Sequence, residues 1–170
     1  MEPTELRAKQ APLKKQYKEK PSTALVKVDA RAVLSVDEIH CEIETWGGPV
    51  TAGLHPATGG DGSKACSADM LLESLVACAG VTLKSVATAM GIKLISAEVS
   101  ADGIWDARGT LGIESKVFVG LTKIDLVFHI KSDSDPSSIK KLIELTERYC
   151  VIYQTLKGQI DLSMHCVTLN

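Results

Sequence analysis

The chain has 170 residues with 19 lysines and arginines against 21 acidic residues, and its net charge of −2 gives no general basic surface for nucleic acid. Its hydrophobic content of 45% and charged content of 24% are ordinary for one soluble globular domain, and we identify no apolar run long enough to cross a bilayer. The N-terminus lacks the apolar stretch of a signal peptide, so we expect a cytoplasmic protein that contacts neither membrane nor nucleic acid.

The first part of the chain combines a polar arm, two strand patterns and a loop. Residues 1–23 are charged and poorly periodic, which predicts a solvated extension or a short surface helix, with a role in covering a partner subunit as the alternative. Residues 24–33 and 37–46 alternate apolar and polar side chains, which predicts two half-buried strands joined as an antiparallel hairpin. Residues 47–66 are rich in glycine, proline and small side chains, which predicts a long loop.

A long helix is predicted next, with Ser67 as its N-cap and Gly91 as the residue that ends it. It contains the stretch "LLESLVACAGV", residues 71–81, with Cys78 near the centre. The helix carries apolar and small side chains on all of its sides, which indicates burial on most of its sides. Its length of roughly 24 residues corresponds to about 36 Å, so we expect it to run through the middle of the domain.

Further strand patterns occupy the second half of the chain. We assign strands to residues 95–101, 110–120, 123–131 and 160–166 from their alternating apolar side chains. Antiparallel hairpins with helices inserted between them are typical of the α+β class. No internal repeat or second domain is visible.

A second helix is predicted between the last two strands. Asp135 is a suitable N-cap and Pro136 fits the first helical position. The helix breaks near Cys150, and residues 151–156 predict a further short helix. A helix N-terminus stabilises a thiolate, so we expect this position to lower the pKa of Cys150.

The five cysteines are Cys41, Cys66, Cys78, Cys150 and Cys166. Their odd number and the lack of a CxxC spacing argue against a secreted disulfide scaffold and against a zinc ribbon, and the four histidines are scattered, so we predict no metal site. Cys41 and Cys166 lie on apolar strand faces and are predicted to be core residues. Periodicity alone leaves Cys78 open between a packing residue and a reactive thiol.

Two motifs resemble the OsmC/Ohr family. They are "GGDGSKACSADMLLESLVACAGVTLKSVA", residues 59–87, and "LTERYCVIYQTL", residues 145–156. Cys78 and Cys150 match the two cysteines of the family pattern. The resemblance divides the chain into an extension, residues 1–23, and an OsmC-like domain, residues 24–170.

This resemblance implies a fold and an assembly. The implied fold is α+β, with two curved antiparallel sheets around two central helices. The implied assembly is an intertwined homodimer with two active sites at the subunit interface.

The resemblance also implies a thiol peroxidase that defends against organic hydroperoxides. In such enzymes the first cysteine, here Cys78, attacks the hydroperoxide, and the second, here Cys150, resolves the oxidised product. A dithiol reductant restores both thiols, and no metal, haem or flavin cofactor is needed. The alternative is a non-catalytic OsmC-like protein that binds a small apolar ligand at the dimer interface.

The chain departs from the family pattern around the first cysteine. The glutamate expected at the start of the long helix and the arginine expected in the preceding loop are missing, and Val151 replaces the usual proline. Candidate residues for activating the Cys78 thiolate in their place are His55, Lys64, Asp69, Arg31, Arg108 and Arg148.

Overall fold

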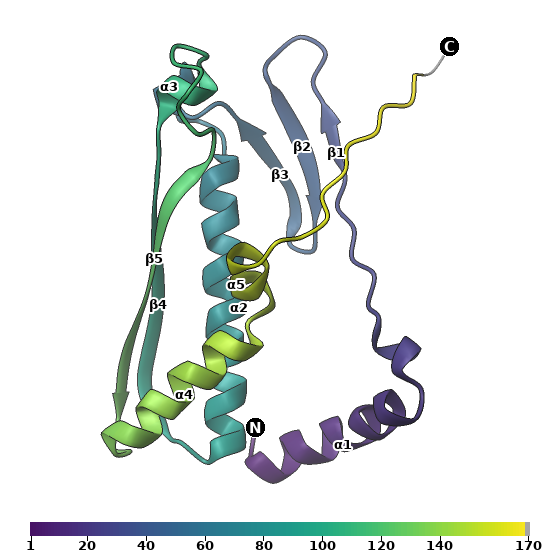
Figure 1. The fold of residues 1–170 in the computed structure, drawn as a ribbon, viewed down its shortest axis with the longest axis vertical. Coiled ribbons are helices and arrows are strands. Elements are labelled where there is room, and N and C mark those ends of the chain that lie inside the picture. The colour runs from purple at the N-terminus through teal and green to yellow at the C-terminus, as the bar shows by residue number, and fades with distance from the viewer. Residues whose placement is uncertain (169–170) are drawn as a thin grey trace.

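The computed structural model describes residues 1–168 and is a mixed α+β fold with two antiparallel sheets (Figure 1). In chain order the elements are α1 (Pro3–Glu19), the 3-10 turn η1 (Pro21–Ala24), β1 (Ala32–Leu34), β2 (His40–Thr45), β3 (Gly48–Gly53), the 3-10 turn η2 (Pro56–Thr58), α2 (Ser67–Met90), β4 (Leu94–Trp105), α3 (Ala107–Thr110), β5 (Leu121–Ser132), α4 (Pro136–Tyr149) and α5 (Val151–Lys157). One sheet has the order β1–β2–β3, and the other pairs β4 with β5. The predicted α+β class is therefore confirmed.

The 24-residue helix α2 runs the length of the domain, as the sequence predicts (Figure 1). Its N-cap is Cys66 and not Ser67, so the helix begins one residue earlier than expected from the cap. Gly91 ends it in the left-handed conformation with φ 69°, which glycine adopts without steric cost. One face of α2 is fully buried against β4 and α4, while other sides remain open, so the expected burial on most sides is not reached within one chain.

Helix α2 is also long and apolar enough to cross a membrane by length and composition, which corrects the expectation that the chain contains no such run. The core helix of a soluble protein meets the same criterion. Because α2 packs against β4, α4 and α5, its apolar character is explained by the core that it builds.

The hairpin of β4 and β5 covers one side of α2. The two 12-residue strands pair antiparallel from Leu94 opposite Ser132 to Trp105 opposite Leu121. They confirm the strands predicted at 95–101 and 123–131 and extend both.

The strand predicted at residues 110–120 is wrong. The chain there forms the end of α3 and an irregular loop. The side chain of Asp106 accepts a hydrogen bond from the backbone N–H of Arg108 and starts α3, and Gly112 and Gly120 have φ values of 68° and 150°. These local conformations interrupt an extended strand.

The first sheet corrects two further predictions. β2 confirms the strand at 37–46, but β1 has only three residues, so most of the strand predicted at 24–33 is unpaired. Residues 48–53, assigned to a loop, form β3 and pair with β2 in full register. Glycine and proline conceal this strand because they remove the alternation of apolar side chains on which the prediction depends.

The second helical region follows the prediction closely. The side chain of Asp135 accepts a hydrogen bond from the backbone N–H of Ser138 at 3.0 Å and caps α4, with Pro136 in its first turn. Cys150 separates α4 from α5. Packing of α4 on α2 forms the core cluster of Leu83, Ala87, Ile92 and Leu142.

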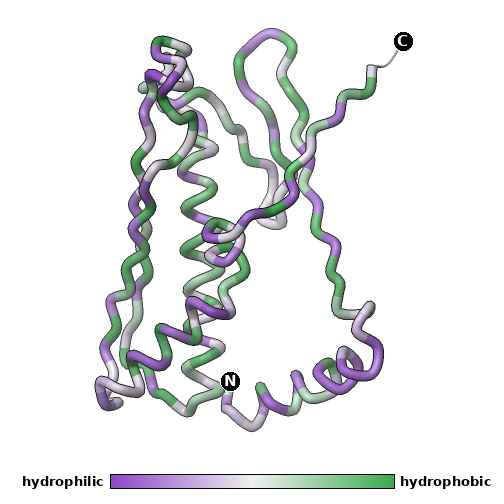
Figure 2. Tube along the Cα trace, viewed as in Figure 1, coloured by the Kyte–Doolittle hydropathy of each residue, from purple (hydrophilic) through white to green (hydrophobic). Residues whose placement is uncertain are grey.

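Two segments with strand-like sequences have no strand partner within residues 1–168. Residues 25–30 lie in extended but unpaired backbone, and so does the predicted strand 160–166 (Figure 2). Their apolar side chains are exposed, with Leu162 85% and Met164 97% accessible. Cys166 is exposed too, which corrects its assignment to the core, whereas Cys41 is half-buried in β2. The extension contributes α1, a surface helix without buried residues that contacts α2.

The core cluster predicts the effect of one truncation. Leu142 is 0% exposed between α4 and α2, and Leu142→Ala should lower the free energy of unfolding by about 2–5 kcal/mol because it leaves a cavity. The control Val36→Ala, at a side chain 98% exposed, should change it by less than about 0.5 kcal/mol. Equal losses for the two variants in denaturant unfolding would contradict this assignment of the core.

Candidate active site

Cys78 and Cys150 reach the same place from different helices. Cys78 is a half-buried residue of α2, and Cys150 is the single extended residue, with φ −74° and ψ 109°, between α4 and α5. An extended residue cannot continue a helix, so α5 begins anew at Val151 with N–H groups that have no partner in a preceding turn. The Cys150 side chain is buried, with 1% of its surface exposed.

The N-terminus of α5 and two side chains, those of Cys150 and Thr82, lie at the Cys78 sulfur. Burial acts to raise the pKa of the Cys78 thiol. Hydrogen bonds lower it: the largest effect comes from the backbone N–H of Ile152, followed by the Cys150 thiol and the backbone N–H of Val151. The Thr82 hydroxyl adds a smaller effect, and the net pKa of Cys78 lies below its usual value. Donors at a helix N-terminus favour the thiolate, which is the reactive form of cysteine.

Cys150 is shifted in the opposite direction. Burial raises the pKa of its thiol, and the neighbouring Cys78 raises it further, while the backbone N–H groups of Tyr153 and Ile152 lower it less. The prediction that the helix terminus would lower the pKa of Cys150 is therefore wrong. The helix was placed correctly and its N–H groups act on both thiols, but burial and the neighbouring Cys78 outweigh them at Cys150.

Hydrogen bonds between α4 and α5 hold the site together. The backbone N–H of Cys150 donates to the Thr146 carbonyl at 2.9 Å, and the Gln154 N–H donates to the Cys150 carbonyl at 3.0 Å. The Gln154 side chain donates to the Glu147 carbonyl at 2.7 Å, and Lys157 pairs with the Glu147 carboxylate at 2.7 Å. These contacts fix the direction in which α5 starts, and with it the direction of its N–H groups.

Two of the candidate activating cations are engaged elsewhere. Lys64 lies 3.7 Å from the carboxylate of Glu38 near the first sheet. Arg108 forms an ion pair with Asp106 at 2.5 Å, which lowers the pKa of that carboxyl to about 2. Neither cation is among the groups that shift the pKa of Cys78.

The other candidates are likewise not among the groups that shift the pKa of Cys78. The His55 ring packs edge-on against Trp105, with centroids 5.6 Å apart. The Arg148 guanidinium lies over the neighbouring Tyr149 ring at 5.5 Å. Asp69 lies in the first turn of α2, and Arg31 precedes β1. Within residues 1–168, none of the six candidates acts on Cys78 as a hydrogen-bond donor or a neighbouring charge.

Sequence reasoning missed Thr82 as a contact of Cys78. A signal was present, because Thr82 follows Cys78 by four positions in the motif and such residues share a helix face. The backbone N–H groups of Val151 and Ile152 carry no such signal, since any residue type supplies them. For residues 1–168 no cluster of His, Cys, Asp or Glu could hold a metal ion.

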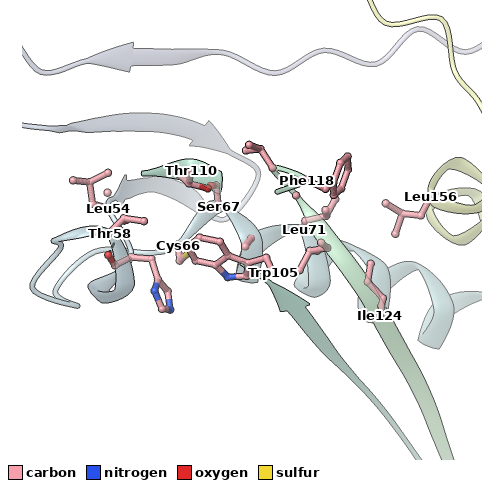
Figure 3. Close-up of a pocket in the computed structure, with 16 residues that line it drawn as sticks. Leu54, Thr58, Cys66, Ser67, Leu71, Trp105, Thr110, Phe118, Ile124 and Leu156 are labelled. Atoms are coloured by element: carbon pink, nitrogen blue, oxygen red, sulfur yellow. Dashed lines mark hydrogen bonds between the residues drawn. The ribbon is translucent and has the colours of Figure 1, made fainter. Parts of the chain in front are cut away.

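A large cavity lies at the start of α2, not at the thiol pair. Its volume is about 570 Å³, and its walls are mostly apolar, with Leu71, Trp105 and Phe118 among them (Figure 3). Cys66 lines this cavity, whereas Cys78 does not. The cavity can accommodate a small apolar ligand.

The contact with Thr82 predicts a change in thiol reactivity. Thr82→Val removes a hydrogen bond to the Cys78 sulfur, which should raise the pKa of Cys78 and lower its alkylation rate with iodoacetamide at neutral pH by a few-fold. The control Thr82→Ser retains the hydroxyl and should keep the rate close to that of the unmodified protein. An unchanged rate in Thr82→Val would show that this contact does not stabilise the thiolate.

Comparisons with solved structures find the same fold. An OsmC-like protein from Mycoplasma pneumoniae has a TM-score of 0.65 and 25% identity, covering 78% of this chain and 89% of its own. An organic hydroperoxide resistance protein from Elizabethkingia anophelis has a TM-score of 0.62 and 19% identity, covering 81% and 92%. A protein from Legionella pneumophila, described as organic hydroperoxide resistance protein OsmC, has a TM-score of 0.61 and 16% identity, covering 81% and 95%.

The comparison with protein families agrees with these structures. No curated protein matches the chain significantly. The family described as OsmC-like protein matches residues 60–165, which is more than half of the chain and includes both Cys78 and Cys150. The chain therefore belongs to the OsmC-like protein family.

Proposed function

We propose that the protein is a thiol peroxidase that reduces organic hydroperoxides, with Cys78 as the attacking and Cys150 as the resolving cysteine. The observation that carries the proposal is the contact between the two thiols at the N-terminus of α5. There the pKa of Cys78 is lowered after the opposing effect of burial, and the pKa of Cys150 is raised, first by burial. One thiol is thereby prepared to ionise while its neighbour stays protonated.

In the first step the Cys78 thiolate attacks the terminal oxygen of the hydroperoxide. An S–O bond forms and the O–O bond breaks, and the departing alkoxide takes a proton to give the alcohol. Cys78 is oxidised to a sulfenic acid. The N–H groups of Val151 and Ile152 hold the thiolate without a metal or a cationic side chain.

In the second step Cys150 attacks the sulfur of the Cys78 sulfenic acid. An S–S bond forms, the S–O bond breaks, and the hydroxide leaves with a proton as water. A dithiol then reduces the Cys78–Cys150 disulfide and is itself oxidised to a disulfide. Such a cycle requires a reducing compartment, so we place the protein in the cytoplasm.

The names of two structural relatives support an organic hydroperoxide as the substrate. The proteins from Legionella pneumophila and Elizabethkingia anophelis are both named for organic hydroperoxide resistance. The helix around Cys78 carries aliphatic side chains, including Leu75 and Val81, which favour an alkyl group over a polar substrate.

We also propose that the working form is a homodimer. Residues 25–31 and 158–168 expose apolar side chains and backbone groups without strand partners, and an unpaired strand edge is a template for another chain. Val81 is 73% exposed, on the side of α2 opposite its buried face. A second copy that covers these surfaces would complete the sheets and the core.

The apolar cavity at the start of α2 favours a second candidate function. A non-catalytic OsmC-like protein would use this space of about 570 Å³ to bind a small apolar ligand. Cys78→Ser separates the two functions, because it should abolish peroxide turnover but leave binding of an apolar fluorescent probe unchanged. Loss of probe binding in Cys78→Ser would count against a separate binding site.

The peroxidase proposal predicts a specific disulfide. Stoichiometric cumene hydroperoxide should link Cys78 to Cys150, and Cys150→Ser should instead accumulate a sulfenic acid on Cys78 that dimedone traps. Peptide mass mapping reads both products. The control Cys41→Val should form the disulfide at an unchanged rate, because Cys41 lies in β2.

One outcome would end the peroxidase proposal. If Cys78 remains a free thiol after peroxide treatment of the folded protein, the binding function takes its place.

The dimer proposal predicts a molar mass in solution. Light scattering at micromolar concentration should give twice the mass of one chain. Removal of residues 159–170 should shift the mass toward the monomer, because it deletes the exposed apolar segment after α5. A monomer for the full chain would contradict the proposal.

A further inference from the structure

We propose that a reductant reaches the oxidised protein through the cavity between α4, α5 and the β4–β5 hairpin, and attacks the sulfur of Cys150 instead of that of Cys78. The inference rests on the proposed thiol peroxidase function and concerns its reductive half. It assigns a separate access route to the reductant and names the sulfur atom at which reduction begins.

The cavity opens onto one cysteine of the pair. Its volume is about 210 Å³, and Cys150 lines it together with Leu126, Phe128 and Ile143. Cys78 is not among its lining residues. Because Cys150 is 1% exposed, a cavity that this residue lines offers a route by which a small molecule can approach its sulfur.

The size and walls of the cavity limit the reductant. At about 210 Å³ it is smaller than ordinary ligand pockets of about 300–1,000 Å³, so it admits a small thiol and not a bulky group. Its lining residues are mostly apolar, with Thr146, Glu147 and Tyr153 as the residues that carry polar groups. A small, neutral dithiol matches these walls.

The chemistry of thiol–disulfide exchange also favours attack on the sulfur of Cys150. A thiolate that attacks a disulfide expels the other sulfur as the leaving group, and the thiol of lower pKa leaves faster. Attack on Cys150 expels Cys78, whose pKa is lowered by the N–H of Ile152 against the effect of burial. Attack on Cys78 would expel Cys150, whose pKa is raised, first by burial.

The proposed reduction proceeds in two exchanges. One thiolate of the dithiol bonds to the Cys150 sulfur, the Cys78–Cys150 bond breaks, and its electron pair stays on Cys78 as a thiolate. The second thiolate of the reductant then attacks the first sulfur of the reductant, which is bonded to Cys150. The bond to Cys150 breaks, and Cys150 leaves as a thiolate and takes a proton. The dithiol ends as a disulfide, and both protein thiols are restored.

The first test locates the bond made by the reductant. The disulfide is formed with diamide, a thiol oxidant that is not a peroxide, so reduction can be followed whether or not the protein is a peroxidase. Brief treatment with the monothiol 2-mercaptoethanol, followed by iodoacetamide, should place the mixed disulfide on Cys150 and the alkyl group on Cys78. A mixed disulfide on Cys78, or no Cys78–Cys150 bond after diamide, overturns the inference.

The second test fills the cavity. Leu126→Phe enlarges a lining side chain on β5 and should slow reduction by dithiothreitol by about tenfold or more, equivalent to about 1.4 kcal/mol in the barrier. The matched control Ile124→Phe adds the same ring on the same face of β5, two residues away and outside this cavity, and should leave the rate within about twofold. Equal rates for the two variants overturn the inference.

The two proposals fail in different ways. If peroxide does not oxidise Cys78, the peroxidase function is lost, while the diamide-treated protein still shows which sulfur is attacked. If peroxide oxidises Cys78 but the mixed disulfide maps to Cys78, the function stands and the access route is wrong.

Discussion

The candidate active site depends on the interruption of the helix at Cys150, between α4 and α5. A continuous helix would pair the N–H groups of Val151 and Ile152 with carbonyls of α4. Because Cys150 is extended, α5 starts separately and its first N–H groups meet the sulfur of Cys78. The end of one helix, the start of the next and a thiol on a third thus form a single unit, which the contacts of Gln154 with α4 hold in place.

The same arrangement explains how two cysteines in contact acquire different chemistry. Both are affected by burial and both have N–H donors of α5 beside them. At Cys78 these donors, the Cys150 thiol and the Thr82 hydroxyl outweigh burial, whereas at Cys150 burial and the sulfur of Cys78 outweigh the donors. The family arginine and glutamate, which this chain lacks, would stabilise a thiolate with charged side chains. In our account backbone N–H groups do so here, with Arg108 bound to Asp106 and unavailable to the thiol pair within the chain. The asymmetry sets the order of events in the proposed cycle.

Elements with local signals could be predicted from the sequence. Gly91 ends α2 and Asp135 starts α4 because a left-handed residue and a capping carboxylate act on their immediate neighbours. The strand expected in residues 24–33 forms only at its end, as β1, and the strand expected in residues 160–166 does not form within residues 1–168, because a strand needs a neighbour that the sequence pattern does not specify. The pairing of the two cysteines followed from the family motifs and not from periodicity. The contact of Thr82 could have been found from its spacing, whereas backbone donors are invisible in a sequence.

The central claim is that Cys78 ionises before its neighbour because α5 begins at its sulfur. The most direct measurement is the alkylation rate of each cysteine, resolved by peptide mass spectrometry, from about pH 5 to about pH 9, a range that spans the usual thiol pKa. A short unstructured cysteine peptide, alkylated in parallel, is the reference for an ordinary thiol with a pKa of about 8.5. The account predicts that Cys78 titrates at a lower pH than this peptide and that Cys150 titrates at a higher one. Titration of Cys78 at or above the pH of the peptide, or ionisation of Cys150 first, would contradict it.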